Sequence, residues 1–163
     1  MVIPTQVPYH ESLDLTLCGD MGRVHRLCRD VVTIAVEPLG LTQSRWTALI
    51  HINMLNEGVT QQQLAHSLGI EMPSLTRTIK QLETQLLITR CVDEHDKRSK
   101  NIYFTEQGHK TLHTLKEKIA EVKKQLYHGF TIDQLDLMAQ GLIKMETNAQ
   151  NCIENHLKNK ANK

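Results

Sequence analysis

A group of polar side chains in the middle of the chain has the spacing of one helical face. Ser74, Arg77, Thr78 and Gln81 lie at i, i+3, i+4 and i+7. Hydroxyl, guanidinium and amide groups can bond to the base edges or the phosphates of a nucleic acid. The other candidates in this segment are Pro73, Thr76 and Lys80. Pro73 suits the first turn of a helix, where no backbone N–H donor is needed.

An apolar stripe accompanies this polar face, and it is predicted to point inward. Its members are Leu75, Ile79, Leu82 and Leu86, at i, i+4, i+7 and i+11. A recognition helix needs this division between an anchored back and a polar, cation-bearing front. An ordinary surface helix with a solvated polar face has the same pattern, so periodicity alone leaves both interpretations open.

A short cationic segment lies further along, between two β-prone runs at 88–92 and 101–104. Asp96 to Lys100 contains three cations, namely Lys97, Arg98 and Lys100. Two short strands around a charged loop predict a hairpin. Charged hairpin tips are commonly only solvated. The candidate recognition helix, the turn at 69–71 and a short helix predicted over 60–68 make a helix-turn-helix. Beside such a motif, a cationic tip suits the minor groove of A·T-rich DNA, which attracts inserted Arg. Asp96 can hold the Arg98 guanidinium in one direction.

The elements that must position these residues are predicted from periodicity and capping signals. A long helix over 12–37 is ended by Pro38 and Gly40. Thr42 caps a second helix that runs to about 55. Thr60 and Gln63 form a capping box for a short helix over 60–68, and Gly69 ends it. The candidate recognition helix follows and runs to about Gln85.

The carboxyl-terminal part of the chain predicts two more helices. Thr105 caps the first, and Gly129 breaks it. Thr131 and Gln134 form a second capping box for the last helix, which runs to about 157, beyond which the polar tail is expected to fray. Apolar residues recur as heptad seams in the first helix of the chain and in these two carboxyl-terminal helices. Cys28 and Cys152 occupy seam positions, so they are expected to be small buried side chains.

Composition excludes several classes of function. The chain has 163 residues and a net charge of +1, so nucleic-acid binding must use a local patch. Aromatic residues make up 4%, too few for stacking platforms that bind single strands. No CxxC pair, nucleophile motif or phosphate loop appears, so neither an enzyme nor a bound cofactor is predicted. The cysteine pattern and the lack of a membrane-length apolar run predict a cytoplasmic location.

The sequence resembles the MarR family of winged-helix transcription regulators, and most closely its SlyA-like branch. The resemblance runs from about Asp20 to about Cys152. It rests on the segments 41–46 (LTQSRW), 63–65 (QLA), 69–78 (GIEMPSLTRT), 81–83 (QLE), 87–90 (LITR), 96–98 (DKR) and 104–108 (FTEQG).

This resemblance implies a mostly α (α+β) fold: a single domain over 1–163, with a winged helix-turn-helix at 42–104 and dimerisation helices at 12–37 and 105–157. It implies a homodimer on double-stranded DNA, at a pseudo-palindromic A·T-rich site. Pro73, Ser74 and Arg77 would sit at the major groove, and Arg98 in the minor groove. The family usually has Gly where this chain has Leu86, so a left-handed conformation there would cost energy.

The resemblance also implies a cleft for a small aromatic carboxylate near Arg29, Ser44 and Trp46. An Arg can bind a carboxylate at two points, and Trp can form a wall for a ring. The simpler interpretation makes Trp46 plain core. Two other patterns stay open: His109 and His113, one turn apart, as surface histidines or metal ligands, and Cys18 or Cys28 as a redox-sensitive thiol.

Two rival functions remain open on the sequence alone. One is a sensor of the same fold that responds mainly to a ligand, a metal or thiol oxidation, with release of DNA as its output. The other is a helical dimeric adaptor that has lost DNA binding. The intact set of Arg77, Asp96 and Arg98 favours a DNA-binding regulator.

Overall fold

The computed structural model describes residues 16–92 and 100–161. It divides the chain into two compact units, 1–126 and 127–163. The elements in chain order are α1 (Thr16–Val36), the 3-10 helix η2 (Glu37–Leu39), α2 (Gln43–Leu55), β1 (Val59–Thr60), α3 (Gln61–Leu68), α4 (Met72–Thr84), β2 (Ile88–Val92), β3 (Lys100–Phe104), α5 (Glu106–Leu126) and α6 (Ile132–Ala161). A mostly helical chain with one small sheet confirms the predicted fold class.

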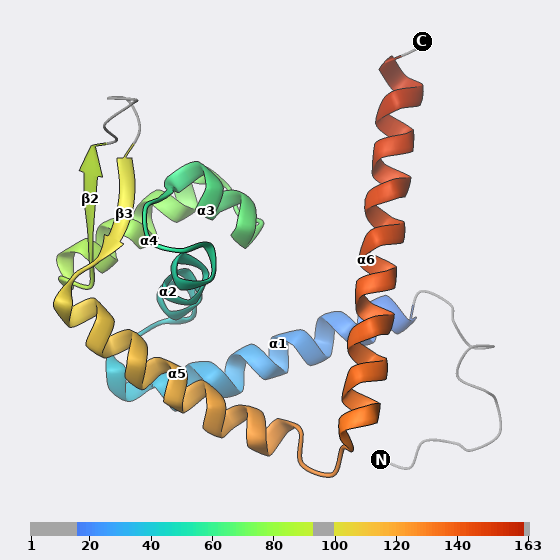
Figure 1. Cartoon of the computed structure of the whole chain (residues 1–163), viewed down its shortest axis with the longest axis horizontal. Helices are drawn as coiled ribbons and strands as arrows, with labels where there is room; N and C mark the ends of the chain where they lie inside the picture. Colours follow the sequence, from blue (N-terminus) through green and yellow to red (C-terminus); the bar gives the residue numbers. More distant parts are fainter. Residues whose placement is uncertain (1–15, 93–99, 162–163) are drawn as a thin grey trace. The chain divides into compact units, whose positions relative to one another are not determined.

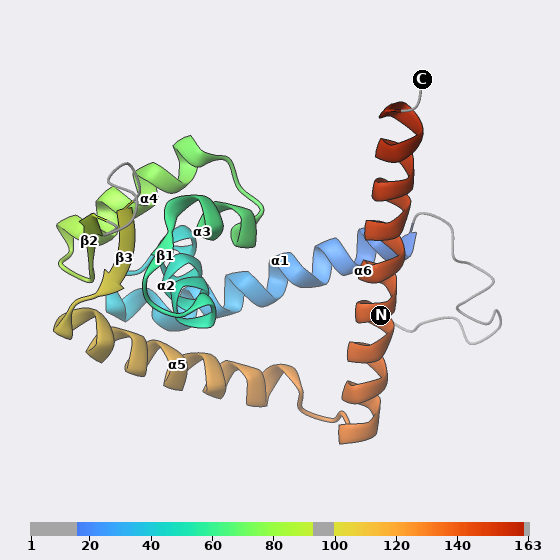
Figure 2. The same cartoon turned by 45° about the horizontal axis from the view of Figure 1, so that its top comes forward.

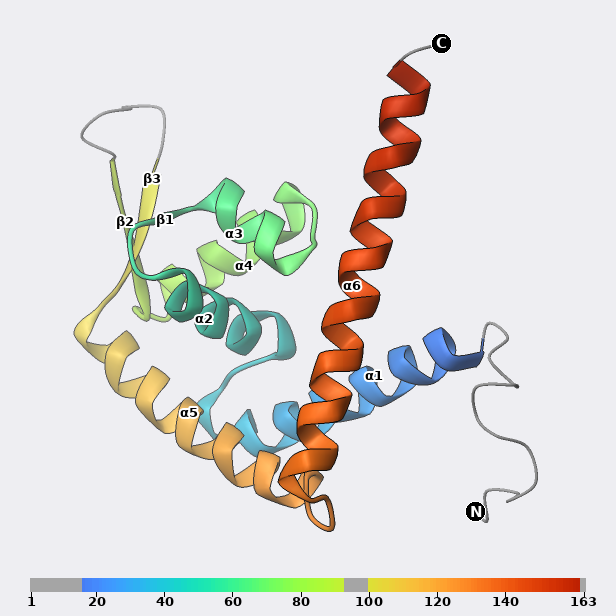
Figure 3. The same cartoon turned by 45° about the vertical axis from the view of Figure 1, so that its right-hand side comes forward.

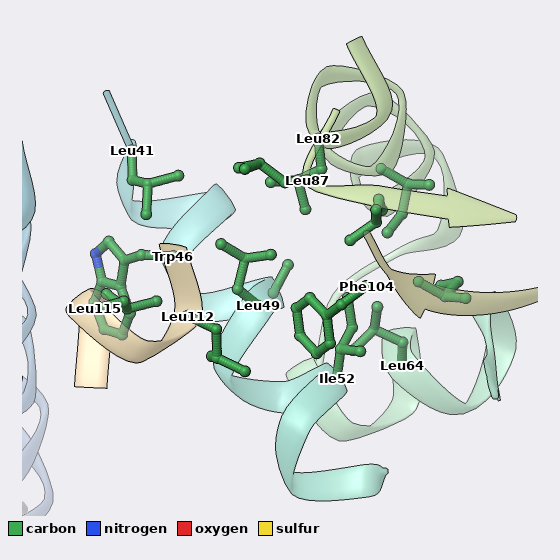
Figure 4. Packing of buried hydrophobic residues seen from close by; sticks show 14 of the residues in the cluster. Leu41, Trp46, Leu49, Ile52, Leu64, Leu82, Leu87, Phe104, Leu112 and Leu115 are labelled. Carbon is green, nitrogen blue, oxygen red and sulfur yellow. The ribbon is translucent and has the colours of Figure 1, made fainter. Parts of the chain in front are cut away.

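Helix α2 is the centre of the first unit. It contacts the α3–α4 pair on one side and α1 and α5 on the other, an arrangement that is visible in Figures 1 and 3. The core packs around it, and the side chains of Trp46, Leu49 and Ile52 on α2 are buried. Figure 4 shows these three among leucines from α3, α4 and α5 and Phe104 from β3. The helix-turn-helix therefore rests on α2.

The sheet has three antiparallel strands in the order β1-β3-β2 (Figure 2). Strands β2 and β3 form the predicted hairpin, with a register from Ile88 opposite Phe104 to Val92 opposite Lys100. Sequence reasoning missed β1, a two-residue strand in which Val59 pairs with Ile102. A strand this short has no periodicity, because the pairing alone defines it.

The capping signals determine several helix boundaries. The Thr60–Gln63 capping box is complete, and Gly69 takes the left-handed conformation that ends α3. Thr131 and Gln134 make the second reciprocal pair at the start of α6. Thr42 is the N-cap of α2, but its side chain makes no capping bond. The expectation of a frayed tail beyond 157 is wrong as far as Ala161, because α6 stays helical to that residue.

Leu86 stands where the family resemblance leads one to expect glycine, and its backbone is left-handed, with φ +56°. The end of α4 is a Schellman motif: Leu86 N–H donates to the Glu83 carbonyl at 2.9 Å, and Leu87 N–H donates to the Leu82 carbonyl at 3.0 Å. Leucine pays for this conformation because its Cβ crowds the following carbonyl. Leu86 is 70% exposed, so the prediction that it points inward with Leu75, Ile79 and Leu82 is wrong, and packing offsets little of that cost.

Replacing Leu86 with glycine should therefore stabilise the protein. The gain should be about 1 kcal/mol, because glycine adopts this conformation without a Cβ clash. Urea unfolding of Leu86→Gly measures it. Gln85→Gly is the matched control: Gln85 has an ordinary φ of −82°, so glycine there should lose about 0.5–1 kcal/mol. Equal destabilisation by both variants would contradict the strain at Leu86.

His51 links α2 to α3 through a 2.8 Å hydrogen bond between its Nδ1 and the Ser67 hydroxyl oxygen. Burial lowers the pKa of His51 below its ordinary value of 6.5. The unfolded chain then takes up a proton at this site more readily than the folded one. Stability is therefore fully present above pH 6.5 and falls as the pH drops below that value.

We expect urea unfolding at pH 7.5 and pH 5.5 to show a smaller loss of stability for His51→Gln than for the parent protein. Glutamine keeps an amide that can reach Ser67, but it cannot be protonated in this range. All other titrating groups are shared, so the difference isolates His51. An identical pH dependence in the two proteins would refute the assignment.

Candidate nucleic-acid interface

Helix α4 has the two-sided character that its sequence predicts. Leu75, Ile79 and Leu82 are fully buried. The residues that the structure leaves exposed on its outer side are Pro73, Ser74, Thr76, Arg77, Lys80 and Gln81. The turn from α3 into α4 is fixed by Gly69 and by the N–H of Ile70, which donates to the Ala65 carbonyl at 3.2 Å. A short polar helix face is thereby held outward on a rigid support.

Thr78 does not belong to that face, so its predicted place on the exposed polar side of α4 is wrong. Only 5% of Thr78 is exposed, and its hydroxyl donates to the Ser74 carbonyl at 3.3 Å. Position 78 completes an i, i+3, i+4, i+7 set with Leu75, Ile79 and Leu82, which is the buried side of the helix. A threonine can be buried in this way because its hydroxyl bonds to the preceding turn.

The hairpin presents Lys100 as an exposed residue at the start of β3. The other residues predicted for its tip, Asp96, Lys97 and Arg98, lie outside the described residues. The minor-groove contact by Arg98 therefore stays a prediction.

Arg90 of β2 ties the hairpin to both helices of the helix-turn-helix. Its Nε and Nη2 donate to the two carboxylate oxygens of Glu83 on α4, at 2.8 and 2.6 Å. Its Nη1 donates to Gln61 Oε1 on α3 at 3.1 Å. A two-point Arg–carboxylate pair fixes direction as well as distance. Sequence reasoning did not identify this link, because opposite charges seven residues apart on different elements have no local signature.

Two of the residues predicted for a ligand cleft line a hollow of about 420 Å³, and the third does not. Arg29 of α1 and Ser44 of α2 lie in its wall, together with Ser74 and Thr78 of α4. Trp46 is not in the lining; it is buried, and its indole N–H donates to the Thr33 hydroxyl at 3.0 Å. The structure therefore supports the interpretation of Trp46 as core.

The histidines of α5 lie beside carboxylates. His109 Nε2 is 3.0 Å from Glu57 Oε1, and His113 Nε2 is 3.4 Å from Glu117 Oε1. Within residues 16–92 and 100–161, no three His, Cys, Asp or Glu side chains are grouped so as to hold a metal ion. In the same part of the chain, no helix is long and apolar enough to cross a membrane.

Comparison with known protein families shows that part of this chain matches a family model. Residues 39–99 match the model of the MarR family. That range includes α2, α3, α4 and β2. The match therefore covers the helix-turn-helix, the helix α2 that supports it, and the first strand of the hairpin.

Solved structures match over most of the chain. The transcriptional regulator PA3341 is 28% identical over 83% of this chain and 98% of its own, with a TM-score of 0.77. The transcriptional regulator SlyA is 24% identical over 83% and 94%, with a TM-score of 0.74. A putative MarR-family regulator from Listeria monocytogenes, solved in complex with a 26mer DNA, is 24% identical over 80% and 87%, with a TM-score of 0.74. All three of these proteins are named as transcriptional regulators.

Proposed function

We propose that this chain, whose winged-helix region is of the MarR family, is a transcriptional regulator that binds double-stranded DNA in a sequence-specific manner. The observation that carries the proposal is the outward face of α4: Ser74, Arg77 and Gln81 are exposed above a fully buried apolar back. A helix of this kind can enter the major groove. Two matched regulators were solved in complex with DNA, one of them with a 23-mer duplex, which supports the same role here. The finer resemblance to the SlyA-like branch is part of the proposal.

The proposed assembly is a homodimer formed by the first and last helices. Val24, Leu27 and Ile34 of α1 are exposed although they are apolar. In α6 the exposed apolar residues are Ile132, Leu137, Met138, Leu142, Ile143, Met145, Ile153 and Leu157. Cys152, expected to be buried in this seam, is exposed too. Apolar surface of this extent marks an interface, and we infer that a second copy of the chain covers it. Light scattering at micromolar concentration should therefore give twice the chain's mass of 18.7 kDa.

Selection from a pool of random duplexes tests the function itself. We expect enrichment of a pseudo-palindromic A·T-rich site, because a two-fold dimer reads two half-sites and the proposed Asp96–Arg98 wing favours a narrow minor groove. A chain that forms the dimer and enriches no sequence would contradict the proposal. That outcome would favour the dimeric adaptor.

A second candidate function is release of DNA on binding a small aromatic carboxylate. The 420 Å³ hollow favours it, because Arg29 offers a cation and Ser74 and Thr78 place the recognition helix in the same wall. The Arg29 guanidinium already faces the Gln43 amide, whose oxygen can accept from Nη1 at 2.8 Å. Calorimetric titration with benzoate tests this. Binding should weaken in Arg29→Ala, and unchanged binding in that variant would place the ligand elsewhere.

A further inference from the structure

A second hollow, of about 460 Å³, lies between the start of α2 and the later turns of α4. Its lining is Arg45, Arg77, Lys80, Gln81, Thr84 and Gln85. Three of these side chains carry a positive charge, three are neutral and polar, and none is a carboxylate. Arg45 comes from α2, outside the helix-turn-helix, and was not among the residues predicted from the sequence.

The three cations of this hollow have no carboxylate partner in the described part of the chain. Some other cations there do pair with carboxylates, such as Arg23 with Asp20 and Arg90 with Glu83, both at 2.6 Å. No such pair within residues 16–92 and 100–161 involves Arg45, Arg77 or Lys80. Like charges gathered without a counter-ion repel one another, and an anion seated among them removes that cost.

Arg45 is held in place before any ligand arrives. Its side chain is half-buried, and its Nε donates to the Thr42 hydroxyl at 3.1 Å. That bond fixes the direction of the guanidinium, and its Nη groups have no hydrogen-bond partner among the described residues. A pre-ordered guanidinium loses less entropy on binding and offers two donors to a phosphate.

We propose that this hollow seats a phosphodiester of duplex DNA, with Arg45 as a residue that determines DNA affinity. The proposal rests on the function proposed above. A DNA phosphate fits better than a free anion because the hollow shares Arg77 and Gln81 with the outward face of α4, so it continues the surface that faces the groove. Arg45 does not lie on the recognition helix, so its contribution is independent of base sequence.

The test is the salt dependence of binding to the selected site and to a scrambled duplex of equal length. Each phosphate contact contributes about 0.9 to the slope of log affinity against log salt. Two copies of Arg45→Ala in a dimer should therefore lower the slope by about 1.8. Between 50 and 200 mM salt, the parent should lose about 12-fold more affinity than the variant does. Both duplexes should be affected alike.

Two further variants separate the phosphate contact from other effects. Lys110→Ala removes an exposed cation on α5, which pairs with Glu106, and should leave the slope unchanged. Arg45→Lys keeps the charge and should restore most of the slope. Melting curves of all variants report whether the fold is intact.

Several outcomes would overturn the inference. An unchanged slope in Arg45→Ala, with the parent binding DNA, would remove Arg45 from the interface and leave the proposed function standing. Loss of preference for the selected site alone would make Arg45 a base-reading residue. If inorganic phosphate raised the melting temperature of the parent but not of Arg45→Ala, and the DNA slope were unchanged, the hollow would be a site for free anions. A parent that bound no duplex would instead refute the proposed function.

Discussion

Gly108→Ala is expected to destabilise the protein by about 3 kcal/mol, the upper part of the range for overpacked sites. A Cβ atom at Gly108 would lie 1.8 Å from the carbonyl oxygen of Leu87 and 2.9 Å from its carbonyl carbon. Both are backbone atoms, so no side chain can rotate away to make room. The start of α5 or the chain after α4 would have to move.

Neither segment can move without breaking hydrogen bonds. The Thr105 N–H donates to the same Leu87 carbonyl at 3.1 Å, and the Thr105 hydroxyl donates to the Leu86 carbonyl. The Gly108 N–H in turn donates to the Thr105 hydroxyl oxygen at 2.9 Å. Moving α5 outward would strain the two Thr105 bonds, which join the end of the recognition helix to the start of α5. The Gly108 bond ties Thr105 to the first turn of α5, so Gly108 cannot move away independently.

Thermal unfolding measures the effect, and for a chain of this size about 3 kcal/mol corresponds to a fall of roughly 6–12 °C in the melting temperature. Gly141→Ala is the matched control. Gly141 lies within α6, and an added Cβ there has no described atom within 4 Å. Alanine at that position should be neutral or stabilising. A Gly108→Ala protein that melted within 2 °C of the parent would show that α5 does not approach Leu87 this closely.

The sequence predicted the parts of the fold that local interactions determine. The capping box at Thr60 depends on residues three apart, and the stripe of Leu75, Ile79 and Leu82 depends on helical periodicity. Both signals are complete within one or two turns, so a single segment carries them. The outward face of α4 followed from the same periodicity.

The rest of the fold and site depends on partners far away in the sequence. Strand β1 exists because Val59 meets Ile102, and Arg90 is held by Glu83 and Gln61. Thr78 misled the prediction because residues at the edge of a polar face share their spacing with the buried face. Threonine has a methyl group that suits burial and a hydroxyl that suits exposure, so only the packed structure decides between them.

Arg77→Ala should reduce the difference in affinity between the selected site and scrambled DNA more than any other substitution on α4. Arg77 is exposed and lies one turn from the start of the helix, after Pro73. The first turns of a recognition helix enter the major groove, where an Arg can bond both acceptors of a guanine. Losing such a pair costs roughly 1–3 kcal/mol of discrimination in each subunit.

Lys80→Ala should behave differently although Lys80 lines the same hollow as Arg77. Lys80 lies further along the helix, toward the flank, and an ammonium group binds a phosphate as a point charge. Its loss should weaken binding to both duplexes equally and lower the salt slope by about 0.9 per subunit. The control is Lys110→Ala, which removes an exposed cation on α5 that pairs with Glu106 and should change neither the discrimination nor the slope.

The two variants together test the orientation of α4 in the groove. Affinities for the selected and the scrambled duplex, each at several salt concentrations, give the discrimination and the slope from one data set. The expected pattern is lost discrimination in Arg77→Ala and a lowered slope with intact discrimination in Lys80→Ala. The reverse pattern would mean that the helix is rotated by about a quarter turn in the groove. The buried side of α4 is fixed by Leu75, Ile79 and Leu82, so such a rotation would require the whole helix-turn-helix to dock on DNA at a different angle.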